Sequence, residues 1–354
     1  MSILTDLGAR ALRLLPPEAA HTATIRALKA GAGPVQHAPD PPVLRTRLAG
    51  LDLPNPIGLA AGFDKNADVP DAMLAAGFGF VECGTVTPLP QTGNPKPRLF
   101  RLEEDGAVIN RLGFNNEGLA AFCARLRRRS ARPGVVGANI GANKDAADRM
   151  ADYELGLRRV WLHAGYVTVN ISSPNTPGLR GLQDKGALDE LLGRLSQART
   201  PLERAHGRRP LFLKVAPDID ETAVQDIAEA ALAAKLDGLI VSNTTIARPD
   251  SLASRHRSET GGLSGRPLMA PSTRVLAWFR AVLGDRLALI GVGGIASGAH
   301  AYAKIRAGAR AVQLYTGLVY GGPALVGAIK TELAERLTAD GFRTVADAVG
   351  ADQA

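Results

Sequence analysis

Cysteine is scarce in this chain of 354 residues, which contains only Cys83 and Cys123. Two cysteines can form neither a disulfide framework nor a four-cysteine metal site, so we expect reduced thiols and no bound metal. Long apolar runs are missing as well, since nowhere do about 18 apolar residues follow one another as a membrane-spanning helix requires. The N-terminus lacks the basic segment, apolar core and cleavage site of a signal peptide. We therefore expect a chain that stays in the cytoplasm and does not cross a membrane.

Acidic residues are outnumbered, because 42 lysines and arginines stand against 34 aspartates and glutamates and give a net charge of +8. The densest basic cluster lies between Arg125 and Arg132. Such a cluster can attract nucleic acid or anionic lipid, or can be the solvated end of a helix, where cations offset the partial negative charge of exposed carbonyls. We favour the helix end and expect no nucleic-acid partner.

Residues 1–40 differ from the rest of the chain. Apolar residues recur there at three- and four-residue steps, which predicts one face of an amphipathic helix. Pro16 and Pro17 end this helix and can open a second one that stops before Gly31. A glycine- and proline-rich linker follows, so residues 1–40 are predicted to be a short helical hairpin with a linker. Its apolar stripe consists of Ile3, Leu4, Leu7, Ala11, Leu14 and Leu15.

Short apolar runs alternate with helix-like stretches in residues 41–340. Eight runs have the length and β-branched content of buried strands, and a parallel sheet joined by helices and closed on itself is a (β/α)8 TIM barrel. We therefore predict an α/β fold in which this barrel forms one domain, residues 341–354 being a tail. Long loops at residues 85–108 and 244–266 are expected to hold ligand. The predicted strands are Ile57–Ala61, Phe80–Cys83, Val135–Ile140, Val167–Ile171, Leu211–Val215, Gly238–Val241, Ala288–Val292 and Ala311–Leu314.

The most informative segment runs from Val167 to Gly181, where a β-branched strand ends in a loop of hydroxyls, amides and two prolines. Such a composition is also common in ordinary turns. In a barrel, however, working residues lie where strands end and the following loops begin. Each predicted strand ends in or leads into glycine, an amide, a hydroxyl or lysine, which favours an active site at this mouth.

Two further strand ends indicate an anionic ligand. The glycines at 291, 293 and 294 and the backbone after Tyr315 follow strands seven and eight, where barrels commonly bind phosphate. Lys214 is predicted to be buried at the end of strand five, where an ammonium needs a partner. That partner can be a reduced flavin, whose negative charge a cation stabilises, or a carboxylate in an internal ion pair.

The motifs at residues 58–65, 110–116, 139–144, 170–181, 242–245, 261–268 and 314–317 resemble those of the quinone-dependent, membrane-associated dihydroorotate dehydrogenase family, over nearly all of residues 45–330. The resemblance implies oxidation of (S)-dihydroorotate to orotate, in pyrimidine biosynthesis, with FMN as hydride acceptor. It implies FMN contacts from Ala61, Gly62, Lys65, Thr85, Asn139, Asn170, Lys214, Ser242, Gly265, Gly294, Tyr315 and Thr316. It implies substrate contacts from Lys65, Asn110, Arg111, Leu112, Gly113, Phe114, Asn170, Asn175, Asn243 and Thr244.

The same resemblance assigns a mechanism. Ser173, where the cytosolic class carries cysteine, takes the C5 proton of the substrate as general base, and Thr176 is a candidate proton relay. The flavin is then reoxidised by ubiquinone or menaquinone, which enters between the helices of the hairpin, with His21 and Arg101 as candidate contacts. His21 alone can equally be an ordinary half-buried histidine. We expect a monomeric peripheral protein on the cytoplasmic face of the cell membrane, held by the amphipathic hairpin.

Two other classes remain open. The flavin-dependent tRNA dihydrouridine synthases also combine a barrel, FMN and a basic surface, but they depend on a catalytic cysteine, and neither cysteine here lies in a matching loop. A non-enzymatic barrel with the hairpin as a docking module is weaker, because the polar strand ends are complete. A yellow chromophore in the purified protein separates that last case at once.

Overall fold

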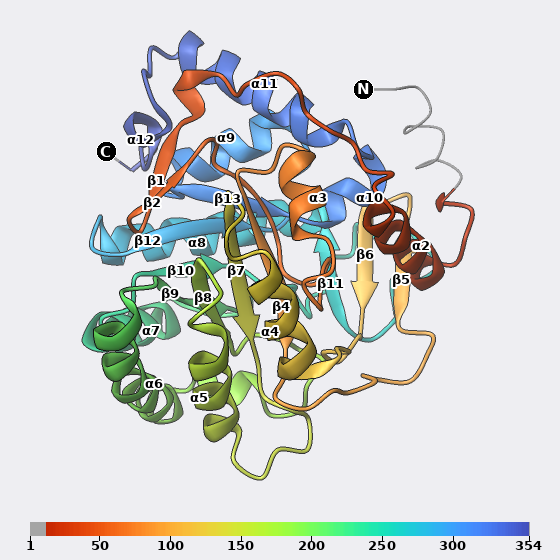
Figure 1. Ribbon diagram of the computed structural model, residues 1–354. Coiled ribbons are helices and arrows are strands. Elements are labelled where there is room, and N and C mark those ends of the chain that lie inside the picture. The colour runs from red at the N-terminus through yellow and green to blue at the C-terminus, as the bar shows by residue number, and fades with distance from the viewer. Residues whose placement is uncertain (1–11, 354) are drawn as a thin grey trace.

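The computed structural model describes residues 12–353. Eight parallel strands close into a barrel in chain order, which confirms the predicted (β/α)8 fold (Figure 1). Each predicted strand is present within a few residues of its expected bounds. The barrel strands are β3 (Ile57–Leu59), β4 (Phe80–Val86), β7 (Val135–Ile140), β8 (Tyr166–Asn170), β9 (Leu211–Val215), β10 (Gly238–Val241), β12 (Ala288–Val292) and β13 (Ala311–Leu314).

Helices follow the barrel strands and surround them on the outside (Figure 1). The helices cover the outer face of the parallel sheet, and side chains of the strands fill the inner face, so both faces of the strands are buried. The outer helices are α3 (Pro70–Ala75), α4 (Gly118–Arg128), α5 (Arg149–Val160), α6 (Lys185–His206), α7 (Glu221–Ala233), α8 (Met269–Leu283), α9 (Gly298–Arg306) and α11 (Leu325–Ala339). Shorter helical turns are η1 (Pro42–Leu44), η2 (Arg180–Gln183), η3 (Arg266–Leu268), α10 (Thr316–Gly321) and α12 (Val345–Ala348).

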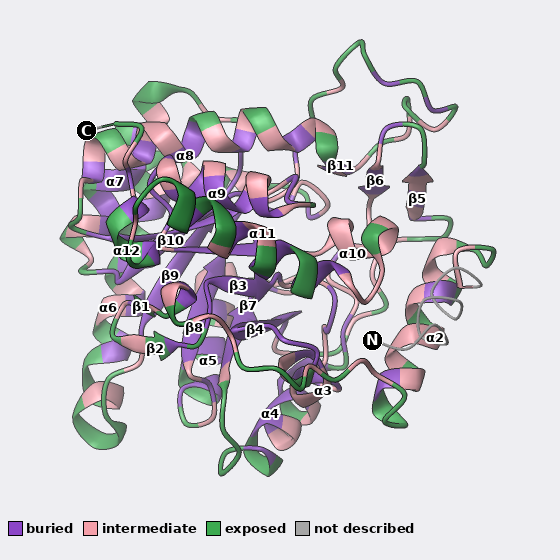
Figure 2. Cartoon of the chain, turned by 90° about the horizontal axis from the view of Figure 1, so that it is seen from above, coloured by how far each residue is buried: buried purple, intermediate pink, exposed green. Residues whose placement is uncertain are grey.

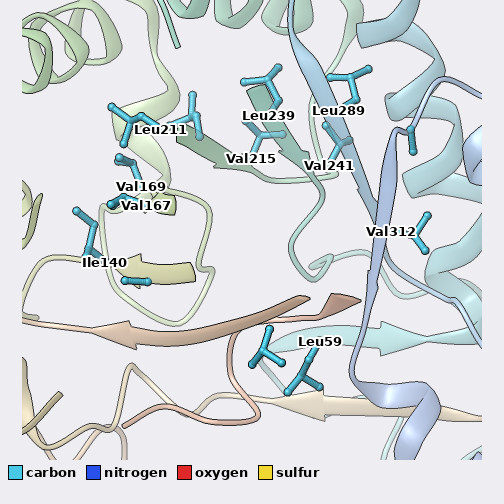
Figure 3. Close-up of a cluster of buried hydrophobic side chains, with 14 of the residues drawn as sticks. Leu59, Ile140, Val167, Val169, Leu211, Val215, Leu239, Val241, Leu289 and Val312 are labelled. Atoms are coloured by element: carbon cyan, nitrogen blue, oxygen red, sulfur yellow. The ribbon is translucent and has the colours of Figure 1, made fainter. Parts of the chain in front are cut away.

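The strands alternate between two hydrophobic clusters, because successive side chains point to opposite faces of a strand. One set, which includes Leu59, Val167 and Leu239, packs with the apolar faces of the helices (Figure 3). The other set fills the barrel interior, and glycine makes room there for aromatic rings. A Cβ atom at Gly137 would lie 2.1 Å from the Tyr166 ring. Only the inward-pointing residues at the carboxyl ends of the strands can therefore reach the barrel mouth.

Two small antiparallel sheets accompany the barrel. A hairpin of β1 (Thr46–Leu48) and β2 (Leu51–Leu53) adds Leu48 and Leu53 to the interior cluster. A three-stranded sheet contains β5 (Leu99–Leu102), β6 (Ala107–Asn110) and β11 (Gly262–Gly265), in the order β11-β6-β5. The long segments at 85–108 and 244–266 are therefore not merely loops, since each contributes to one sheet that stands beside the barrel mouth (Figure 2).

The second predicted N-terminal helix is present as α2 (Pro17–Lys29), which begins directly after Pro16. It lies against β5, on the side of the barrel mouth where the three-stranded sheet stands (Figures 1 and 2). The predicted first helix falls mostly on residues 1–11, outside the described residues. Within residues 12–353, no helix has the length and apolarity needed to cross a membrane. At the other end of the chain, α12 buries Val345 and Ala348 and contacts α9 and β1.

Candidate active site

A cavity of about 1380 Å³ opens at the carboxyl ends of the barrel strands and extends to α2. The strand ends and their loops supply its polar lining. The opposite side, here called the α2 wall, consists of Pro17, Ala20, His21, Thr24, Ala27 and Leu28. One continuous space therefore joins a polar barrel mouth to a mostly apolar helix.

A buried carboxylate lies beneath this cavity. The Glu82 side chain on β4 is fully buried and accepts four hydrogen bonds from inward-pointing side chains of β7, β8 and β13. The donors are Asn139 Nδ2 at 2.7 Å, Gln313 Nε2 at 2.9 Å, Tyr166 Oη at 3.0 Å and Thr168 Oγ1 at 3.2 Å. Three of these donors share Oε2, and Asn139 alone donates to Oε1, so the side chains of three other strands hold this carboxyl group in place.

The Glu82 carboxylate orients a chain of polar groups that we call the floor. Because Asn139 donates to a carboxylate, its carbonyl oxygen faces Thr85 and accepts from the hydroxyl at 2.6 Å. Thr85 Oγ1 in turn accepts from Asn170 Nδ2 at 2.9 Å. Asn170 Oδ1 accepts from Ser172 Oγ at 2.9 Å, and that hydroxyl accepts from Asn243 Nδ2 at 3.0 Å. The floor thus runs from Glu82 through Asn139, Thr85, Asn170 and Ser172 to Asn243, with each amide held in one orientation.

Ser173 lines the cavity in the loop after β8 and is 6% exposed. Its Oγ accepts a hydrogen bond from the Asn175 backbone amide at 3.2 Å. Asn175 Nδ2 lies 3.3 Å from Asn110 Oδ1, and the Asn175 carbonyl accepts from Asn94 Nδ2 at 3.2 Å. The loop therefore bridges to the end of β6 and to the segment before β5, and it holds a buried hydroxyl toward the cavity.

Arg180 joins this loop to the loops after β9 and β10. Its guanidinium donates to the Ser172 carbonyl at 3.1 Å and to the Thr244 carbonyl at 2.9 Å, and pairs with Asp218 at 2.7 Å. Asp218 also accepts from the Ile246 backbone amide at 3.1 Å. A planar guanidinium with five donors suits such multiple contacts. Arg180 and Asp218 therefore fix three loops relative to one another around Ser173.

Two lysines face the cavity, one from a strand and one from a loop. The Lys214 side chain on β9 is 5% exposed, and among residues 12–353 its amine donates no hydrogen bond and forms no ion pair. The alternative of an internal ion pair is thus not supported, although Glu82 opposes the lowering of the Lys214 pKa by burial. Burial lowers the pKa of Lys65, in the loop after β3, to about 8. Both amines are available to an anionic or electron-rich ligand.

Glycines form a cradle at the end of the cavity formed by β11, β12 and β13. Gly265, Gly293 and Gly294 all have positive φ angles, and a Cβ atom at Gly294 would lie 2.5 Å from the Met269 Cα atom. Thr316 begins α10 at the same end, and its hydroxyl donates to Ser264 Oγ at 2.9 Å. Only glycine lets the backbone fold this closely, so the cradle brings main-chain groups up to a ligand.

The α2 wall meets the barrel through an aromatic cluster. His21 Nδ1 lies 3.4 Å from Tyr315 Oη, and the His21 ring packs edge-on against Phe63 with centroids 5.5 Å apart. Burial, reinforced by the nearby Lys65 charge, lowers the pKa of His21 to about 3. His21 is therefore neutral at physiological pH and can donate or accept one hydrogen bond at each ring nitrogen.

Arg101 on β5 lines the cavity but is already engaged. Its Nη1 donates to the carbonyls of Arg13 at 2.7 Å and Leu15 at 3.0 Å. The guanidinium thus ties the start of the described chain to the three-stranded sheet. Next to these carbonyls, the Leu14 side chain is 88% exposed.

Most of the predicted site residues meet at this cavity, but three side chains do not line it. Asn139 lies one layer below, where it connects Thr85 to Glu82. Arg111 pairs with Glu259 at 2.8 Å and stacks on Phe100. Thr176 is buried in the loop after β8. The residues that do line the cavity are His21, Ala61, Gly62, Lys65, Thr85, Arg101, Asn110, Leu112, Gly113, Phe114, Asn170, Ser173, Asn175, Lys214, Ser242, Asn243, Thr244, Gly265, Gly294, Tyr315 and Thr316.

Sequence reasoning missed Glu82, Gln313 and Arg180. Glu82 and Gln313 lie inside strands of otherwise apolar residues, and a polar residue there signals an inward-facing network. Gln313 Oε1 is buried without a hydrogen-bond partner among the described residues, and the side chain lines the cavity. Arg180 carried no local signal, because its partner Asp218 is 38 residues away.

The two cysteines lie apart from this chemistry. Cys83 and Cys123 are both buried, and neither lines the cavity. Burial raises the pKa of both thiols, and the nearby Asp64 carboxylate raises that of Cys83 further. Neither thiol is placed to act on a ligand in the cavity.

Comparisons with known proteins identify the family. The family model for dihydroorotate dehydrogenase matches residues 43–337. Two proteins named dihydroorotate dehydrogenase (quinone) are 58% identical over 349 residues, from Parvibaculum lavamentivorans, and 56% identical over 344 residues, from Xanthobacter autotrophicus. These alignments cover 99% and 96%, respectively, of each chain.

Solved structures agree with the sequence matches. The ligand-free DHODH of Eimeria tenella superposes with a TM-score of 0.92 at 44% identity, covering 96% of this chain and 99% of that one. The complex of that organism's DHODH with ferulenol also gives a TM-score of 0.92, at 42% identity and 96% coverage of each chain. With its barrel, its polar mouth and these matches over nearly its whole length, the chain belongs to the dihydroorotate dehydrogenase family.

Proposed function

We propose that this protein oxidises (S)-dihydroorotate to orotate in pyrimidine biosynthesis and passes the electrons through FMN to a membrane quinone. The observation that carries the proposal is the single cavity in which a polar barrel mouth and the α2 wall share one space. Such a cavity serves two half-reactions. The polar side suits a substrate with a carboxylate and imide-like edges, and the apolar side suits a quinone.

The residues present fit a flavin mononucleotide. The cradle of Gly265, Gly293 and Gly294 suits a phosphate, which main-chain amides and helix ends commonly bind in barrels. Lys214 offers an ammonium without a protein partner among the described residues, as a reduced isoalloxazine ring requires. Thr85, Asn170 and Gln313 line the same cavity and supply hydrogen-bonding groups for the flavin ring. Bound FMN supplies the hydride acceptor for the substrate's C6.

Ser173 is the general base in this proposal. Its hydroxyl lines the cavity within a loop that Arg180 and Asn175 hold in place, so it can take the C5 proton of a bound substrate. A serine hydroxyl is a weak base in water, and exclusion of water by the closed loop favours the transfer. Thr176 stays a proposed relay, and it would have to connect with Ser173 through water, because no direct hydrogen bond joins the two within residues 12–353.

The substrate is held by groups that surround Ser173. Asn110, Asn175 and Asn243 line the cavity and can donate and accept along the edges of the dihydroorotate ring. Lys65 contributes the positive charge for the carboxylate. Arg111 does not line the cavity and its guanidinium pairs with Glu259, so the proposal gives its side chain no substrate contact.

The quinone, which we propose to be ubiquinone or menaquinone, approaches along the α2 wall. His21 is neutral and lies beside Tyr315, so it can bond a carbonyl of the quinone head group. Arg101 can join only with nitrogens left over from its bonds to the N-terminal carbonyls. We propose that the exposed Leu14 and the preceding apolar stripe lie in the membrane interface on the cytoplasmic face, as in other amphipathic helices.

The proposal is tested by one assay on the purified protein. Dihydroorotate oxidation is measured with a soluble quinone, fumarate and NAD side by side, after release and identification of the bound flavin. We expect FMN and turnover with quinone alone. Turnover with fumarate or NAD in place of quinone contradicts the assignment of the acceptor, and absence of a flavin contradicts the whole proposal.

A further inference from the structure

Lys304 on α9 is a buried cation that the proposed reaction leaves unused. Its side chain is 0% exposed, and its amine donates to Ser272 Oγ at 2.8 Å and Thr273 Oγ1 at 3.1 Å. In the described part of the chain, no carboxylate lies within 4.0 Å of this amine. An ammonium buried without a counter-charge is costly, and burial lowers the pKa of Lys304 to about 7.

Other buried lysines of this chain do not share this isolation. Lys330 on α11 is 3% exposed and pairs with Asp40 at 2.7 Å. Lys214 faces the cavity, where a ligand can meet its charge. Lys304 has no carboxylate beside it and does not line the cavity. An anion that stabilises its charge would therefore have to lie beyond Ser272 and Thr273, the two hydroxyls to which the amine donates.

The glycine cradle lies on that side. The Lys304 stem packs against Gly291, where a Cβ atom would lie 3.0 Å from Lys304 Cδ. Ser272 Oγ accepts from the amine and lies 2.6 Å from the Leu268 carbonyl and 3.3 Å from the Gly293 carbonyl. The Ser272 hydroxyl thus lies between the Lys304 ammonium and Gly293, which belongs to the cradle. The hydroxyls lie near the N-terminus of α8, whose first turn adds the positive end of a helix dipole and no negative charge.

We propose that Lys304 is the buried counter-charge of the flavin's phosphate, acting from behind the cradle through Ser272 and the Gly293 loop. It is a positioning residue, since it touches neither the cavity nor the reacting atoms. The inference rests on the proposed function, because the phosphate is that of FMN. It predicts that the charge of Lys304 favours FMN over riboflavin, which has the same ring system but no phosphate.

The test is a pair of titrations on flavin-free protein, followed by the quenching of flavin fluorescence. FMN and riboflavin are each titrated into the wild type, Lys304→Gln and Lys330→Gln. Glutamine keeps a donor for the hydroxyls and removes the charge, and Lys330 is the matched buried lysine with its own carboxylate. We expect Lys304→Gln to lose about tenfold in FMN affinity with riboflavin affinity unchanged, as a charge acting over several ångströms of protein allows. Lys330→Gln should keep the wild-type ratio of the two affinities even if it unfolds at lower temperature.

An unchanged ratio in Lys304→Gln, or an equal loss of both flavins, overturns the inference and leaves Lys304 as a structural residue. If Lys304→Gln does not fold, Ser272→Ala takes its place, because it keeps the charge and removes the hydroxyl between amine and cradle. Ser272→Ala should lower the preference for FMN over riboflavin, and an unchanged preference in this variant would again contradict the inference. A wild-type protein that binds neither flavin contradicts the proposed function itself, so the two failures are distinguishable.

Discussion

The floor of the cavity and its α2 wall are held in different ways. The floor is a continuous chain of buried amides and hydroxyls that ends on the Glu82 carboxylate. The α2 helix is held by two ion pairs near its ends, Glu18 with Arg98 at 2.7 Å and Lys29 with Asp68 at 2.8 Å, and by the contact of His21 with Phe63 and Tyr315. A half-exposed pair such as Lys29 with Asp68 contributes up to about 1 kcal/mol. Removing one partner from a buried hydrogen bond costs about 1–3 kcal/mol.

This contrast indicates a division of labour. Proton and hydride transfer need donors and acceptors fixed to fractions of an ångström, which the floor and the Arg180 contacts provide. An apolar electron acceptor needs room to enter more than it needs fixed geometry. A helix held by two ion pairs and one aromatic contact suits that need. Changes near the floor should therefore slow reduction of the flavin by dihydroorotate, and changes at the α2 wall should slow its reoxidation by quinone.

The largest effect is expected for Ser173→Ala. Loss of a positioned general base typically costs about 10²–10⁴-fold, so stopped-flow bleaching of the flavin by dihydroorotate should slow by that factor while orotate still binds. Bleaching at near wild-type speed would remove Ser173 from the mechanism. Thr176→Val should slow bleaching less, and a wild-type rate in that variant excludes only the relay.

Arg180→Met should slow bleaching at saturating dihydroorotate by roughly tenfold, because it releases charge-assisted bonds to three loops, each worth about 1.5–3 kcal/mol before other contacts compensate. The flavin content should stay at the wild-type level. Arg180→Lys keeps the charge but cannot span two carbonyls and a carboxylate, so it should recover only part of the rate. A full rate in Arg180→Met, or loss of flavin along with it, contradicts a positioning role confined to these loops.

Orotate affinity should depend on the charge of Lys65. Burial lowers the pKa of Lys65 to about 8 in the free site, so the amine is charged below this pH and loses its proton as the pH rises through it. A bound carboxylate raises that pKa. Affinity measured from the flavin absorbance change should stay level below pH 8 and fall by up to about tenfold per pH unit above it. The Lys65→Met variant should bind weakly with no such slope, and a level wild-type profile to pH 10 refutes the assignment.

The smallest effect is expected at the edge of the α2 wall. Leu14→Glu should lower binding to liposomes by about tenfold at most, because full burial of a leucine contributes about 1.5–3 kcal/mol and an interface buries it only in part. Bleaching by dihydroorotate should be unchanged. Leu155 on α5, which is also exposed, provides the matched control. Equal losses from Leu14→Glu and Leu155→Glu would show that the effect is not specific to this end of the molecule.

Much of the barrel could be predicted from the sequence because its signals are local. A buried parallel strand is a short apolar run, and a polar residue at its end faces the mouth whatever the rest of the fold does. The start of α2 was equally local, since Pro17 can occupy the first turn of a helix but not its interior. Ser173, Lys214 and Asn243 were predicted at the barrel mouth in this way, and all three line the cavity.

The remainder depended on contacts between distant segments. Strand β11 begins and ends with glycine, which is depleted in strands, and it pairs with β6 from a distant part of the chain, so the sequence gives no local signal for this sheet. Glu82 sets the donor-to-acceptor direction of the hydrogen bonds in the floor, and its four donors come from three other strands. The ion pair of Arg111 with Glu259 spans 148 residues, so no local pattern predicts it.

The most direct test of the two-sided cavity is to measure both half-reactions on one preparation that lacks residues 1–31. Rapid mixing with dihydroorotate gives the rate of flavin bleaching, and mixing the reduced protein with quinone gives the rate of its return. We expect bleaching close to the wild-type rate, while reoxidation by quinone and binding to liposomes fall together. If both half-reactions fall in parallel and the protein unfolds at lower temperature, α2 is a stabilising cap of the barrel and the division between floor and wall is wrong.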